Sequence, residues 1–156
     1  MTSRQQRDSS LKEFIVNAKR AAFAGGGKKV LRSDGSKTFT YAEGNLNYTD
    51  RYFGSMRDIG EELVWYKNMP IWGMNYFGGA FTNFRNMKSP TFKFLKNCLM
   101  LVEVNMPYRG PPALTEREFK YKNKVFGNFS MFRGTESIYY KNKKIYSKMY
   151  FGGDII

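Results

Sequence analysis

The sequence predicts an α+β fold of two internally duplicated αβββ units, whose two helices pack on one face of a curved antiparallel sheet of about six to eight strands. The first observation is an internal repeat: residues 66–79 and 140–153 are identical at eight of fourteen positions. The second is that each half opens with apolar residues at helical spacing, followed by short strand-like stretches. Two copies are too few for a solenoid. We therefore expect a single domain over residues 1–156, with pseudo-repeats at about 9–81 and 89–155.

The repeat continues upstream of these two segments. Residues 48–54 align with residues 121–127, and residues 60–65 align with residues 134–139 after a one-residue difference in the turn. Almost every strand position in one half therefore has a counterpart in the other.

The first half is expected to begin with a helix. Residues 1–8 form a polar tail that we expect to fray. Ser9 or Ser10 can cap the helix, with Glu13 completing a capping box with Ser10. The helix should end at residues 25–27, because glycine accepts the left-handed conformation that closes a helix. A phosphate-binding loop is not indicated, since these glycines follow a helix and no Ser or Thr follows the lysines.

The rest of the first half is expected to form three strands. Residues 39–53 have strand character and are expected to bend near Gly44. Residues 60–66 and 69–76 follow, joined by a tight hairpin at residues 67–68.

The second half is expected to repeat this plan. Ser89 can cap its helix, with Pro90 at the first helical position. An irregular crossing segment at residues 106–112 then leads to a second sheet unit over residues 119–155.

Strand alternation predicts which face of the sheet is covered. It separates Trp72, Met74 and Tyr76 from Ile71 and Phe77. The face with Trp72, Met74 and Tyr76 is aromatic and, in the second copy, also carries a charged residue. We therefore expect the opposite face, with Ile71 and Phe77, to pack against the helices. The uncovered face would then be open to solvent, to a second copy in a homodimer, or to a ligand.

The composition excludes several kinds of chemistry. The net charge is +13 and the chain has no histidine, which removes the usual general base and near-neutral pH switch. The single cysteine, Cys98, lies in an apolar helical stripe and suits a structural role. We expect no metal, no cofactor and no membrane partner, because the sequence has neither a metal-ligand cluster nor an apolar run long enough to span a bilayer. With no signal peptide and no possible internal disulfide, a cytoplasmic location is expected.

The candidate ligand-binding residues lie mostly in the first copy, which concentrates tryptophan, methionine, paired carboxylates and an arginine. This combination is typical of an apolar pocket with a few polar anchors. For the two tryptophans, core packing is the alternative role. The candidates are Arg51, Tyr52, Glu62, Trp65, Trp72, Met74, Asn75, Tyr76 and Arg109.

Three functions fit these residues. The first is a non-enzymatic ligand-binding or sensor-type protein, whose small, anionic or aromatic ligand, such as a nucleotide, lies in an aromatic cleft. The alternative is a single-stranded nucleic-acid-binding protein with a basic aromatic sheet face within residues 119–150, although the same lysines also suit a solvated strand face. The third is a hydrolase that uses Asp50, Glu61 or Glu62. It is the least favoured, since neighbouring carboxylates on a strand point apart.

Several stretches resemble a known family: 14–20, 25–27, 52–54, 59–62, 64–67, 71–76, 78–79 and 106–110, with the closing Tyr-Phe-Gly-Gly. They are similar to a bacterial and archaeal domain family of uncharacterised function, found alone or C-terminal to helix-turn-helix regulators. The resemblance covers nearly the whole chain and implies a sensor or ligand-binding role.

Overall fold

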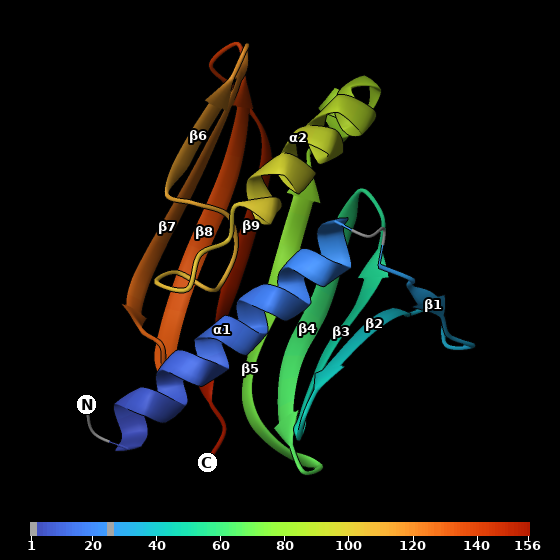
Figure 1. Ribbon diagram of the computed structural model, residues 1–156. Helices are drawn as coiled ribbons and strands as arrows, with labels where there is room; N and C mark the ends of the chain where they lie inside the picture. The colour runs from blue at the N-terminus through green and yellow to red at the C-terminus, as the bar shows by residue number, and fades with distance from the viewer. Residues whose placement is uncertain (1–2, 25–26) are drawn as a thin grey trace.

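The computed structural model describes residues 3–24 and 27–156 and shows two helices against one antiparallel sheet that does not close (Figure 1). The nine strands lie in the order β1-β2-β3-β4-β5-β9-β8-β7-β6. The elements are α1 (Ser3–Ala24), β1 (Val30–Leu31), β2 (Lys37–Glu43), β3 (Leu46–Gly54), β4 (Arg57–Tyr66), β5 (Met69–Ala80), the 3₁₀ segment η1 (Thr82–Met87), α2 (Lys88–Met100), β6 (Ala113–Glu116), β7 (Phe119–Asn128), β8 (Met131–Tyr140) and β9 (Lys143–Asp154). The α+β class, the curved sheet and the two helices on it are thus confirmed.

Both helices cover the same face of the sheet (Figure 1). Helix α1 buries Phe14, Ile15 and Ala18 in a core that it shares with Tyr48 of β3 and Val64 of β4. Helix α2 contributes to a second cluster, formed mainly with strands of the second half. Each helix therefore covers mainly its own half, as expected for a duplicated unit.

The predicted start of the first helix was wrong. Helix α1 already includes residues 3–8, and Ser9 and Ser10 lie inside it. The Ser10 hydroxyl donates to the carbonyl oxygen of Gln6, one turn earlier, at 3.2 Å. Nothing in the polar stretch breaks a helix, so the helix extends past the capping residues. Of the predicted end at residues 25–27, residues 25–26 lie outside the described residues, and the Gly27 amide donates to Ala22 O at 3.2 Å.

The number of strands was also predicted too low. Residues 39–53 form a hairpin, with β2 and β3 joined at Gly44 and Asn45. Gly44 has φ = +59°, a value that glycine adopts freely, so the chain reverses there where we expected a bend. Each half is therefore an αββββ unit, and the short β1 is an addition to the first.

The two halves meet between β5 and β9, and their pairing reproduces the repeat. Tyr76 lies opposite Tyr150, its own counterpart in the second copy. Trp72 lies opposite Asp154, and Ala80 opposite Tyr146, at equal distances on either side. An approximate twofold axis therefore passes beside the tyrosine pair.

The hairpin turns of the two halves have the same backbone conformation. Lys67 and Asn68 have φ values of 47° and 67°, and Lys141 and Asn142 have 47° and 65°. Two successive positive φ values are typical of the tight turns that match the twist of a hairpin, so the prediction at residues 67–68 is confirmed.

The predicted core face was wrong. Trp72, Met74 and Tyr76 lie under the helices and are at most 5% exposed. Phe77 and Phe151 lie on the open face and are 48% and 59% exposed. The polar residues of the inner face misled the prediction, because they are buried as hydrogen-bonded pairs. Among the described helices, none is long and apolar enough to cross a membrane.

The close contact between Gly134 and Tyr150 allows a test of the packing beside the twofold axis. A Cβ atom at this position would overlap the Tyr150 ring, and one at the equivalent Gly60 would overlap Tyr76. We expect Gly134→Ala to lower the free energy of unfolding by about 1–3 kcal/mol, the usual cost of overpacking. Urea denaturation measures this, with Thr135→Ala on the exposed face as the control. A Gly134→Ala protein as stable as the control would contradict the packing described here.

Candidate functional site

Two glutamates lie buried at equivalent positions on the inner face of the sheet. Glu62 on β4 and Glu136 on β8 are at most 1% exposed. The Lys19 ammonium of α1 lies 2.5 Å from Glu62 Oε2. The Arg109 guanidinium lies 2.6 Å from Glu136 Oε1. An unpaired carboxylate in this position would be strongly unfavourable, so each half supplies its own cation from outside the sheet.

Tyrosine hydroxyls complete the Glu136 site, and a tyrosine also lies near Glu62. Tyr121 donates to Glu136 Oε2 at 2.6 Å, and Tyr146 donates to Oε1 at 2.8 Å. Tyr48, the counterpart of Tyr121, lies near Glu62: burial, and then the charge of Glu62, raise the pKa of its hydroxyl. Burial alone would raise the pKa of Glu136, but the charge and hydrogen bonds of Arg109 hold it below its usual value. Glu136 is therefore an ionised structural group.

A second pair of equivalent positions differs between the halves. The Tyr76 hydroxyl donates to Asp50 Oδ1 at 2.6 Å, and the Tyr150 hydroxyl donates to Asn123 Oδ1 at 2.6 Å. The geometry is the same, but the first half has a carboxylate and the second an amide. Burial, and then the charge of Glu62, raise the pKa of Asp50 to about 6.

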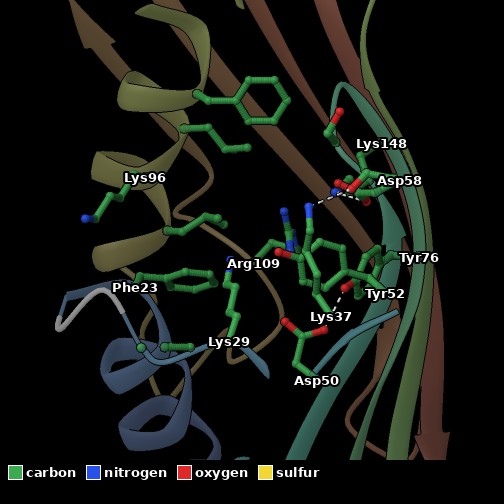
Figure 2. Close-up of a pocket in the computed structure, with 17 residues that line it drawn as sticks. Phe23, Lys29, Lys37, Asp50, Tyr52, Asp58, Tyr76, Lys96, Arg109 and Lys148 are labelled. Atoms are coloured by element: carbon green, nitrogen blue, oxygen red, sulfur yellow. Dashed lines mark hydrogen bonds and ion pairs between the residues drawn. The ribbon is translucent and has the colours of Figure 1, made fainter. Parts of the chain in front are cut away.

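Asp50 lies at a cleft between the helices and the inner face of the sheet (Figure 2). The cavity has a volume of about 480 Å³. Residues of α1 and α2 form one wall, and β3, β4 and β5 form the other. Aromatic side chains line both walls: Phe23, Tyr52, Tyr76 and Phe92.

Basic side chains converge on this cleft from five separate segments. Lys29 follows α1, Lys37 begins β2, and Lys96 lies on α2. Arg109 comes from the segment between α2 and β6, and Lys148 comes from β9. The second half thus contributes three cations, Lys96, Arg109 and Lys148, to a cleft built mainly by the first.

Lys148 occupies the position that Met74 has in the first copy. Its ammonium lies 2.6 Å from Asp58 Oδ1 and 4.8 Å from the centre of the Tyr76 ring. Burial, and then the nearby charge of Arg109, lower the pKa of Lys148. The Asp58 carboxylate opposes these effects, so this pair forms a buried, largely neutralised part of the wall.

The structure brings together some of the predicted site residues. Tyr52, Tyr76 and Arg109 line the cleft. Glu62 lies on the same inner face, where it is paired with Lys19.

Trp72 and Met74 belong to the core. The Trp72 indole is stacked against Phe129 and Phe132, with ring centres 5.5 and 5.6 Å apart, and is fully buried. Its N–H donates to Phe129 O at 3.2 Å. A ligand therefore has no access to this ring in the structure, as the core-packing alternative anticipated.

The remaining three candidates lie on the open face of the sheet, away from the cleft. Arg51 and Asn75 line a second hollow there, with a volume of about 560 Å³, and Arg51 is paired with Asp34. The Trp65 indole N–H contacts Thr49 Oγ1 at 3.4 Å.

Sequence reasoning missed most of the cleft cations: Lys29, Lys37, Lys96 and Lys148. A usable signal existed for Lys148, because the repeat aligns it with Met74, itself a candidate ligand-binding residue. No comparable pattern marks Lys29, Lys37 or Lys96, which come from different segments.

The family of the chain can be stated once this geometry is known. Residues 50–155 match the family model described as "Domain of unknown function (DUF5680)". The chain belongs to this family. The predicted resemblance to an uncharacterised domain is thus confirmed, and the matched region runs from Asp50 to the end of the sheet. No curated protein and no solved structure matched the chain.

The raised pKa of Asp50 gives a prediction about stability. The ordinary pKa of the Asp50 carboxyl is 3.8, and its pKa in the folded protein is about 6. Between these two pH values the carboxyl loses its proton in the unfolded chain but keeps it in the folded protein. The free energy of unfolding therefore falls as the pH rises through this window. Asp50→Asn removes the effect and retains an acceptor for Tyr76. We expect the variant to be more stable than the wild type at pH 7, by about 1–3 kcal/mol, and equally stable below pH 4. Urea denaturation at both pH values measures this difference. A variant that is less stable at pH 7 would contradict the assigned environment of Asp50.

Proposed function

We propose that the protein binds a small, anionic, partly aromatic ligand in the cleft and does not transform it. A nucleotide or related phosphate ester has the required properties. The observation that carries this proposal is the convergence of cations from five separate segments on one cavity with aromatic walls. Small-molecule sites typically have volumes of about 300–1,000 Å³, a range that includes this cavity.

The cations of the cleft fall into two groups. Arg109 and Lys148 are neutralised by Glu136 and Asp58. Lys29, Lys37 and Lys96, in contrast, form no ion pair with any residue that the structure describes. These three lysines therefore supply positive charge that an anionic ligand can neutralise.

Tyr52 connects these charges to a stacking surface. The ammonium groups of Lys29 and Lys37 lie 5.1 and 5.6 Å from the centre of its ring. Figure 2 shows both lysines extending into the cavity beside the tyrosine. A flat ligand that stacks on Tyr52 would thus have its anionic group close to two ammonium groups.

A single-stranded nucleic acid on the open face is a second candidate function. Lys120, Lys122 and Lys124 alternate outward along β7, in steps of about 7 Å. The Lys122 ammonium lies 5.4 Å from the Tyr139 ring, and that of Lys124 lies 5.8 Å from the Phe126 ring. Phe126 is exposed and Tyr139 is half-buried, and accessible rings with adjacent cations are the usual elements of a surface that stacks single-stranded bases.

Calorimetric titration with nucleotides and other phosphate esters tests the first function. Lys29→Ala and Lys37→Ala should each weaken binding about tenfold, because a hydrogen bond to a charged group contributes roughly 1.5–3 kcal/mol. Lys143→Ala, an exposed lysine at the β8–β9 turn, is the matched control and should bind like the wild type. Absence of binding across the panel, or equal affinities for all three variants, would refute the proposal.

Filter binding with single-stranded oligonucleotides at two salt concentrations tests the second function. It predicts affinity that falls steeply with salt, because each neutralised phosphate releases a counterion. Replacing Lys120, Lys122 and Lys124 together by alanine should abolish this binding, while Lys37→Ala should leave it unchanged. Affinity that does not depend on salt would exclude this function.

A further inference from the structure

The two halves use the same buried position in different ways. In the second half, the Asn123 amide is hydrogen-bonded at both ends: Oδ1 accepts from the Tyr150 hydroxyl, and Nδ2 donates to Gly110 O at 2.8 Å. This amide fixes β7 to the crossing segment, and its role is structural.

Asp50 forms the first of these two bonds but not the second. Asn123 faces the backbone carbonyl of Gly110, whereas Asp50 faces the cleft. Its Oδ1 accepts from Tyr76, and the carboxylate lines the cavity. The residue is 9% exposed, so its charge is largely removed from water. Figure 2 shows the carboxylate at one side of the cavity, on the same side as Lys37 and Tyr52.

A carboxylate is an unfavourable choice for this position if packing is its only purpose. Burying a charge is costly, and a second carboxylate, Glu62, lies close enough to raise the pKa of Asp50. Asn123 shows that an amide can accept the tyrosine hydrogen bond in the same geometry. The negative charge of Asp50 therefore requires an explanation other than the hydrogen bond to Tyr76.

We propose that Asp50 accepts a hydrogen bond from a hydroxyl or amino group of the ligand in the cleft. This inference rests on the proposed function and specifies the ligand class: an aromatic phosphate ester that also carries a hydrogen-bond donor, as a ribonucleotide does. An ionised carboxylate is an acceptor only, so it recognises hydroxyl and amino groups and repels other anions. The lysines attract the phosphate, and Asp50 selects against bare anions such as pyrophosphate.

The matched variants are Asp50→Asn and Glu61→Gln. The first introduces the residue that the second half already carries, so the hydrogen bond from Tyr76 has a ready acceptor. The second removes one negative charge from the opposite face of the sheet and serves as the control. Thermal unfolding confirms that both variants are folded before binding is measured.

The probes are the four ribonucleoside 5′-monophosphates and pyrophosphate, titrated by calorimetry at pH 7.5. We expect Asp50→Asn to weaken binding of the preferred ribonucleotide about tenfold or more, because the ligand's donor loses a charged acceptor. Its affinity for pyrophosphate should stay the same or rise. Glu61→Gln should match the wild type with every probe. The 2′-deoxy and 2′,3′-dideoxy forms of the preferred nucleotide then show whether a ribose hydroxyl or a base amino group is the donor.

The outcomes separate this inference from the proposed function. If Asp50→Asn binds the ribonucleotide as tightly as the wild type, and Lys37→Ala does not, the inference is overturned and the proposed function stands. Equal losses for the ribonucleotide and pyrophosphate would also overturn the inference, because Asp50 would then act on the anion site as a whole. If the wild type binds none of these probes, the inference is overturned, and absence of binding across the wider panel of phosphate esters refutes the proposed function as well.

Discussion

The inner face of the sheet is organised by two buried carboxylates and the cations that neutralise them. Glu62 and Glu136 lie under the helices, where an unpaired charge would be strongly unfavourable. Lys19 must therefore come from α1, and Arg109 from the segment after α2. These two contacts link each half's sheet to the chain that precedes it, and they hold α1 and the crossing segment against the inner face.

The cleft follows from the divergence of two units built on this shared plan. In the second half, the crossing segment reaches the Asn123 amide. In the first half, the equivalent Asp50 faces an open cavity. The second half also sends Lys148 across the approximate twofold axis, where Asp58 neutralises it. Duplication thus explains the scaffold, and the differences between the copies explain why one of them has a site.

The duplication could be predicted because identical residues impose the same local geometry in both halves. The Lys67–Asn68 and Lys141–Asn142 turns are an example, since the same pair adopts the same positive φ values twice. The covered face could not be predicted in this way. Lys148 on β9 suggested a solvated surface, and only the ion pair with Asp58, distant in the sequence, shows why it is buried.

Most of the site was equally inaccessible to sequence reasoning. Tyr52, Tyr76 and Arg109 were found because aromatic and charged residues gather near the repeat. Lys29 and Lys37 were missed, because their proximity depends on how the loop after α1 and strand β2 fold beside β3. Trp72 was predicted to bind a ligand because it is a large aromatic side chain on the aromatic face of the strand. The same property suits it to the core, where it lies.

The central claim is that the ligand lies between the helices and the inner face of the sheet. The most direct measurement is a crystal structure with a brominated ribonucleoside 5′-monophosphate, located by the anomalous signal of bromine. The account predicts bromine in the cleft beside Tyr52, with the phosphate within hydrogen-bond distance of Lys29 or Lys37. Bromine on the open face, among the outward lysines of β7, would contradict it.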